Sequence, residues 1–326
     1  MTSDSGHAPM IRLESVTRRF ERFVAVDDVS LDIRRGEVFG LIGHNGAGKS
    51  TLFKMMLGLL RPSEGEITIA GQSVAGAAAR QVRREIGYLP ENVALWDNLS
   101  GLETLRFFAR LKRIDTATCV PMLARVGLGD VGARPVRAYS KGMRQRLGFA
   151  QALLGAPQVL FLDEPTTGLD PRAIHLFWDI LAELRAQGLT IVLTSHVLAE
   201  LQHRVDRVAV LTNGRIQALG TLPDLRAAFD LPLTVRVQLE PGVGEARVGQ
   251  LLHGLPPDVA HQPTQRLPDG VLLRAPRANK RELLQFLLQS PGVVRDFQVD
   301  EPSLEDMFFG DQAAALPPHV AQKEEA

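Results

Sequence analysis

One nine-residue stretch constrains the fold of this chain more than any other. It fits the pattern G-x-x-x-x-G-K-[ST], in which glycines let the backbone turn tightly and point several N–H groups at one anion. Lys49 adds a positive charge, and the Ser50 hydroxyl is a ligand for Mg²⁺. A helix that begins there offers its positive end to the same anion. The stretch consists of Gly43, His44, Asn45, Gly46, Ala47, Gly48, Lys49, Ser50 and Thr51.

The residues on either side of this stretch have the structure that the pattern requires. Val38–Ile42 is a short apolar run that predicts a buried strand, and Leu52–Leu60 predicts an apolar helix. Strand, loop and helix in this order are the setting in which the pattern binds phosphate. We therefore favour a phosphate-binding loop over the alternative, a Gly-rich turn that binds nothing.

The composition limits the classes of partner. The chain has 37 Lys and Arg against 37 Asp and Glu, so its neutral charge gives no reason to expect a nucleic-acid partner. Cys119 is the only cysteine, which excludes a disulfide framework and fits a reducing compartment. The sequence has neither an apolar run long enough to span a bilayer nor a secretory signal. We expect a cytoplasmic protein that reaches any membrane through a partner.

The remaining pattern predicts an α/β protein with two domains. Strands alternate with helices up to about residue 220, which predicts a mostly parallel sheet covered on both faces. Residues 98–155 have helical periodicity and are interpreted as an inserted helical subdomain. The alternating strand Leu233–Leu239 then opens a small α+β accessory domain. The expected parts are a flexible N-terminus (1–10), a core domain (11–228), the accessory domain (229–310) and a disordered tail (311–326).

Polar residues follow two further apolar runs. Asp163 and Glu164 come directly after Val159–Leu162, at the kind of strand end where α/β sheets place ligands. Asp163 can hold Mg²⁺ through water, and Glu164 can polarise the water that attacks a phosphate. The alternative is a pair of acidic helix caps. His196 follows another run and can reach a γ-phosphate, although a single His is more often structural.

A second surface of interest is the polar turn around Ser140 and Gly142, which enters a long helix. In the plainer interpretation, Ser140 caps this helix. In the other interpretation, its hydroxyl and the Gly142 N–H form a second phosphate-binding surface. If the two surfaces of one chain lie far apart, one nucleotide uses both only when two chains face each other.

In this order and context, the motifs resemble the nucleotide-binding subunits of ABC transporters over about residues 11–220. The resemblance implies a P-loop ATPase core and a head-to-tail dimer with two Mg·ATP, each held between the Walker A motif of one copy and the signature motif of the other. It assigns the Walker A motif to Gly43–Thr51, the signature motif to Tyr139–Met143 and the Walker B motif to Val159–Asp163 with Glu164. It assigns the D-loop to Gly168–Asp170, with Asp170 at the nucleotide. It makes His196 the switch histidine and Phe20 the residue that stacks on the adenine. An ordinary strand-end aromatic is the alternative for Phe20.

The chain departs from the family pattern at three positions. Lys141 and Met143 replace the usual Gly and Gln of the signature. Glu91 occupies the position of the usual Q-loop glutamine. Its carboxylate can still approach Mg²⁺ or the attacking water, so it is both a candidate catalytic residue and a candidate metal ligand, but it adds negative charge.

A narrower resemblance involves residues 43–49, 87–93, 139–155 and 302–308, which are similar to the NosF ATPases of NosDFY systems. Those systems support copper-site maturation of nitrous oxide reductase. The resemblance implies a NosY-like polytopic permease, a periplasmic NosD-like protein beyond it, and a peripheral position on the cytoplasmic side of the inner membrane. The alternatives are the ATPase of an ABC-2 type drug or lipid exporter, and a soluble non-transport ABC ATPase.

Two further expectations concern copper and the membrane partner. Cu(I) prefers thiolate and thioether ligands, but Met55 and Met56 lie on an apolar helix and are expected in the core, so we expect no copper site in this chain. Val93, Leu95 and Trp96 are apolar residues that either receive a helix of the partner or pack within the helical subdomain.

Overall fold

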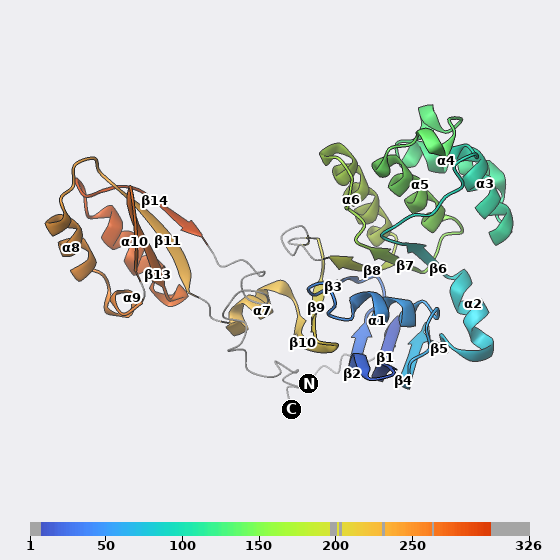
Figure 1. Cartoon of the computed structure of the whole chain (residues 1–326), viewed down its shortest axis with the longest axis horizontal. Coiled ribbons are helices and arrows are strands. Elements are labelled where there is room, and N and C mark those ends of the chain that lie inside the picture. Colours follow the sequence, from blue (N-terminus) through green and yellow to red (C-terminus); the bar gives the residue numbers. More distant parts are fainter. Residues whose placement is uncertain (1–7, 196–200, 202–203, 230–231, 263, 301–326) are drawn as a thin grey trace. The chain divides into compact units, whose positions relative to one another are not determined.

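The computed structural model describes residues 8–195, 201, 204–229, 232–262 and 264–300 (Figure 1). These residues form two compact units, one that ends at Leu222 and one that begins at Pro223. The switch candidate His196, the residues before position 8 and the predicted tail lie outside the described residues.

The first unit is built on a six-stranded sheet with the order β10-β9-β3-β8-β7-β6. All neighbours from β9 to β6 pair in parallel, and only β10 is antiparallel, so the predicted mostly parallel sheet is confirmed. Asn213 and Gly214 join β9 to β10 with φ values of 50° and 78°, as expected for an Asn-Gly hairpin turn. The strands are β3 (Val38–Ile42), β6 (Ile86–Leu89), β7 (Val159–Asp163), β8 (Thr190–Ser195), β9 (Arg207–Thr212) and β10 (Arg215–Gly220).

A second, antiparallel sheet is a feature that the sequence did not predict. It has four strands in the order β2-β1-β4-β5, with Ile11 of β1 opposite Ile69 of β4. Its pairing joins segments that lie far apart in the sequence. The strands are β1 (Ile11–Phe20), β2 (Phe23–Ile33), β4 (Glu64–Ile69) and β5 (Gln72–Ser73).

Helix α1 (Lys49–Met56) lies between the two sheets, and α5 and α6 lie on the other side of the six-stranded sheet (Figure 1). Met55 and Met56 are at most 1% exposed in a core that both sheets share, which confirms them as core residues. The helix ends earlier than the predicted Leu60 because Gly58 adopts a φ of 64°. A Cβ at Gly58 would lie 2.7 Å from the carbonyl oxygen of Val74, so glycine is required there.

Most of the other helices of the first unit come between β6 and β8 in the sequence. Ser100 and Glu103 form a capping box at the start of α3, and Asp170 caps α6. The helices are α2 (Ala79–Arg84), α3 (Gly101–Lys112), α4 (Cys119–Arg125), α5 (Lys141–Leu153) and α6 (Pro171–Ala186), with short 3₁₀ turns at Gly76–Ala78, Thr116–Thr118, Gly129–Val131 and Val136–Ala138.

The second unit has a β-α-β-β-α-β order, which is a ferredoxin-like arrangement. Its four strands follow the order β12-β13-β11-β14, and alternate residues such as Val235 and Val237 are buried against its helices. Helix α7 (Leu222–Phe229) precedes this fold. The elements are β11 (Leu233–Leu239), α8 (Glu245–His253), α9 (Pro257–Ala260), β12 (Gln265–Leu267), β13 (Gly270–Ala275), a 3₁₀ turn at Arg277–Asn279, α10 (Lys280–Leu288) and β14 (Val294–Asp300).

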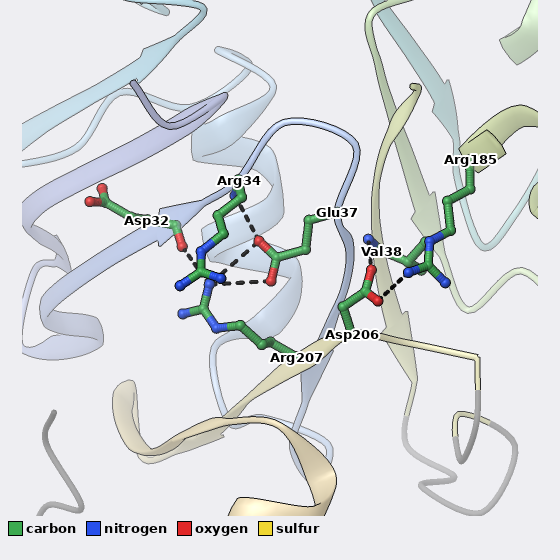
Figure 2. A network of polar contacts seen from close by, with 7 residues as sticks. All are labelled: Asp32, Arg34, Glu37, Val38, Arg185, Asp206 and Arg207. Carbon is green, nitrogen blue, oxygen red and sulfur yellow. Dashed lines mark hydrogen bonds and ion pairs between the residues drawn. The ribbon is translucent and has the colours of Figure 1, made fainter. Parts of the chain in front are cut away.

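Two carboxylates hold the first residues of β3 and β9 (Figure 2). Asp206 accepts a hydrogen bond of 2.9 Å from the Val38 N–H and pairs with Arg185 of α6. Glu37 accepts the Arg34 N–H at 2.7 Å and the Arg207 guanidinium at 3.2 Å.

The pair between Glu37 and Arg207 is buried. The side chains are 4% and 16% exposed, and the same Arg207 nitrogen lies 3.3 Å from the carbonyl oxygen of Asp32 at the end of β2. One guanidinium therefore connects the antiparallel sheet to the start of β3 and β9.

We expect Arg207→Met to lower the free energy of unfolding by about 2–3 kcal/mol, because it leaves the Glu37 carboxylate buried and unpaired. Chemical denaturation of the full chain followed by circular dichroism measures this loss. The double variant Glu37→Gln/Arg207→Met should lose less, because no unpaired charge remains.

The matched control is Arg19→Met, which removes an exposed ion pair with Glu64 whose side chains are 52% and 56% exposed. It should cost less than about 1 kcal/mol. Equal losses for Arg207→Met and Arg19→Met would contradict a structural role for the buried pair.

Candidate functional site

The predicted phosphate loop lies between the end of β3 and the start of α1. Two of its glycines touch neighbouring backbone so closely that no side chain fits. A Cβ at Gly43 would lie 2.5 Å from the Leu211 carbonyl oxygen, and a Cβ at Gly48, where φ is 105°, would lie 2.4 Å from the Ala25 carbonyl oxygen. At Gly46 φ is 84° and the space around it is open. The loop thus has the tight turn that the motif predicts.

Lys49 is 7% exposed and its ammonium lies inside the loop. It donates hydrogen bonds to the carbonyl oxygens of Gly43 at 2.5 Å and His44 at 3.2 Å. Burial lowers the pKa of this ammonium, and the negative charges of three carboxylates oppose the lowering. These carboxylates belong to Glu164, Asp163 and Glu91. The structure therefore brings the loop lysine within electrostatic range of three of the four acidic residues that the sequence selected, while Asp170 is not among them.

Asp163 and Glu164 share one hydrogen-bonding partner that the sequence analysis missed. The hydroxyl of Thr194 donates to Asp163 at 2.7 Å and accepts the Glu164 N–H at 2.9 Å. Thr194 is fully buried and lies opposite Asp163 in the parallel pairing of β7 and β8. Its only signal in the sequence is its place at the end of an apolar run. Glu164 has a φ of 47°, an uncommon backbone conformation for a residue with a side chain.

The oxygen ligands around the loop fit a magnesium ion. Ser50 lies in the first turn of α1 and is exposed, and Asp163 and Glu91 supply carboxylates near Lys49. Mg²⁺ is usually held by one or two such groups together with substrate phosphates. Within the described residues, no group of three or more His, Cys, Asp or Glu side chains is placed to hold a metal ion. Burial and the charge of Asp163 also raise the pKa of the neighbouring Tyr88 to about 12.

The second predicted surface begins α5. The Ser140 hydroxyl accepts the Met143 N–H at 3.2 Å, so the capping interpretation of Ser140 is confirmed, and the phosphate role remains a prediction. A Cβ at Gly142 would lie 3.0 Å from the Gly168 carbonyl oxygen. Asp170 accepts the Ala173 N–H at 2.9 Å as the cap of α6. The signature turn and the turn before α6 are therefore in contact.

Phe20 lies at the end of β1 and is 42% exposed. The guanidinium of Arg18 lies 4.5 Å from the centre of its ring, and it also donates to the Arg61 carbonyl oxygen at 3.0 Å. Arg18 therefore covers one face of the ring. This support was missed in the sequence, although residues two apart on a strand share a face.

The apolar residues near Glu91 divide into two kinds. Val93 packs against α5, because a Cβ at Gly148 would lie 2.9 Å from its side chain. Trp96 is 47% exposed while its ring centre lies 4.8 Å from that of Phe107 and 5.8 Å from that of Phe108. The packing interpretation therefore holds for Val93, whereas Trp96 belongs to a partly exposed aromatic cluster.

Comparison with known proteins finds a matching family profile, a relative and a solved structure that are described as ABC transporter or ATP-binding proteins. A family profile described as ABC transporter matches residues 26–167. The chain is 37% identical over 308 residues to the daunorubicin resistance ATP-binding protein DrrA3 of Streptomyces coeruleorubidus, which covers 92% of this chain and 94% of that protein. The dimeric structure of a bacterial ABC transporter cassette matches with a TM-score of 0.61 at 25% identity, covering 65% of this chain and 99% of that one.

Some relatives are much longer. The chain is 35% identical over 320 residues to ATP-binding cassette sub-family A member 7 of Rattus norvegicus, which covers 95% of this chain and 15% of that protein. The chain therefore spans about 15% of the length of this relative. Within the described residues, no helix has both the length and the apolar character that a membrane span requires.

We expect Lys49→Met to weaken binding of Mg·ATP by roughly 10–100-fold, because it removes a charge-assisted contact from the phosphate loop. Calorimetric titration of the full chain measures the affinity. The control is Lys54→Met, which removes an exposed positive charge from the same helix. An unchanged affinity in Lys49→Met, or an equal loss in Lys54→Met, would contradict the assignment of the loop.

Proposed function

Because this chain belongs to the ABC transporter family, we propose that it is the ATP-hydrolysing subunit that drives a membrane partner. The observation that supports this function best is the group formed by the phosphate loop, its buried Lys49, and three nearby carboxylates. The proposed domain division is an ATPase domain over residues 11–228, with a helical subdomain at about 98–155, and an accessory domain over 229–310.

In this proposal each residue has one task. The loop N–H groups and Lys49 bind the β- and γ-phosphates of ATP, and Phe20 stacks on the adenine. Ser50, Asp163 and Glu91 would hold Mg²⁺, which would neutralise charge on the phosphates. Glu164 polarises the attacking water.

Two copies of the chain face each other head to tail in this proposal. Ser140 and Gly142 of one copy contact the γ-phosphate held by the other, His196 hydrogen-bonds to the same group, and Asp170 lies beside it. The solved relative that is described as dimeric supports this assembly. Hydrolysis then opens the dimer, because the γ-phosphate that joins the two copies is lost.

We expect Glu164→Gln to bind ATP normally but to hydrolyse it roughly 10²–10⁴-fold more slowly, because the amide cannot accept a proton from water. Phosphate release measures turnover, and light scattering with ATP should detect a long-lived dimer. Rapid turnover by this variant would exclude Glu164 as the base.

Two functions of the transporter have specific support. The sequence segments that resemble NosF favour maturation of the copper site of nitrous oxide reductase. In that case the partners would be NosY-like and NosD-like proteins, and this chain would bind no copper. The identity to a daunorubicin resistance protein over 94% of its length favours drug export instead. In both cases the chain would lie peripherally on the cytoplasmic side of the inner membrane. A soluble ATPase that acts on nucleic acid is the remaining class, and the neutral charge of the chain argues against it.

Purification of the tagged full chain from its native membranes separates these functions. We expect a polytopic permease to co-purify. An additional periplasmic β-helix protein would favour copper-site maturation, and a permease alone that lowers cellular drug accumulation would favour export. Absence of any membrane protein would contradict the transport function.

The same purification tests the aromatic cluster of Trp96, Phe107 and Phe108 as the contact with the permease. Trp96→Ala should reduce recovery of the permease, because it removes the largest exposed ring, while the ATPase rate of the isolated chain is retained. Unchanged recovery would mean that the cluster serves packing alone.

A further inference from the structure

Lys141 stands where the family signature has glycine, and its ammonium faces solvent. Within the described part of the chain it forms no hydrogen bond or ion pair, unlike the neighbouring cations. Arg144 pairs with Asp97 at 2.7 Å, and Arg146 donates to the Gly127 carbonyl oxygen at 2.8 Å. Lys141 is therefore the cation of this turn that is available to an outside partner.

The stem of Lys141 is nevertheless held in place. It lies along Gly168, where an added Cβ would come within 2.7 Å of the lysine Cδ and 3.0 Å of its Cε. Gly168 has a φ of 82°, and its carbonyl oxygen also faces Gly142. Packing of the methylenes against this turn leaves the charged end of this exposed side chain to solvent, at the start of the helix that Ser140 caps.

The site on the other side of the proposed interface has an excess of negative charge. Glu164, Asp163 and Glu91 all act on Lys49. A glutamine at position 91 would be neutral, so Glu91 adds one negative charge where a triphosphate must bind. Added negative charge at a triphosphate site opposes binding unless a cation compensates for it.

We propose that Lys141 of one copy lies at the nucleotide site of the second copy and compensates for the negative charge of Glu91 there. The inference rests on the proposed head-to-tail dimer. It explains two departures from the family pattern together. Lys141 is a cation where the pattern has a neutral glycine, and Glu91 is an anion where the pattern has a neutral glutamine. Lys141 is then a residue that completes the site only after two copies meet.

The experiment measures the ATP concentration that gives half of the maximal dimer, by light scattering, in the Glu164→Gln background. Lys141→Met should raise this concentration roughly tenfold, because it removes one charge-assisted contact across the interface. Lys141→Arg should stay close to the parent. Binding of ATP to the monomer, measured at protein concentrations too low for dimers, should be unchanged by Lys141→Met because the lysine acts on the other copy.

A double-mutant cycle tests the pairing with Glu91. In a Glu91→Gln background, Lys141→Met should raise the ATP requirement by only about two- to threefold, since the charge that it compensates for is gone. An equal effect in both backgrounds would overturn the proposed pairing.

Lys54→Met is the control for a simple change in net charge, because Lys54 is also exposed in the first unit. If the parent forms an ATP-dependent dimer but Lys141→Met behaves like Lys54→Met, the role of Lys141 is wrong while the proposed function stands. If the parent forms no dimer with ATP at any concentration, the proposed function itself fails.

Discussion

Two carbonyl oxygens, those of Ala25 and Leu211, press on the phosphate loop at points where only glycine fits. Ala25 belongs to the antiparallel sheet and Leu211 to the parallel one, so the shape of the loop depends on how the two sheets pack around α1. The hairpin turn adds a third contact, because the Gly214 N–H donates to the Ala47 carbonyl oxygen at 2.9 Å. The loop is therefore formed by tertiary packing as much as by its own glycines.

Charged side chains hold β2, β3 and β9 at the ends that lie away from the phosphate loop. Asp206 binds the first N–H of β3, and Arg207 connects Glu37 to the end of β2 (Figure 2). β3 is thus held where it begins by carboxylates and where it ends by backbone contacts to the loop. The ammonium of Lys49 donates to a loop carbonyl oxygen. Its position therefore depends both on the carboxylates at the start of β3 and on the backbone contacts that shape the loop.

Local pattern predicted the elements of the site but not the contacts between them. Val38–Ile42 was predicted with its observed bounds, because a buried parallel strand is a short apolar run between turns. The phosphate loop and the acidic pair follow from motif and position alone. The separate antiparallel sheet and the contact between Gly58 and Val74 at the early end of α1 depend on residues brought together only by folding. No period in the sequence encodes them.

Thr194 illustrates why the site cannot be reduced to its motifs. Its single hydroxyl donates to the Asp163 carboxylate and accepts from the Glu164 N–H, so one buried group on β8 contacts both residues of the acidic pair. The uncommon backbone of Glu164 costs free energy, and the hydrogen bond to its N–H offsets part of that cost. The register of the parallel pair places Thr194 opposite Asp163. The neighbouring strand therefore holds both the Asp163 carboxylate and the Glu164 backbone, and a shift of β8 against β7 would disturb both contacts.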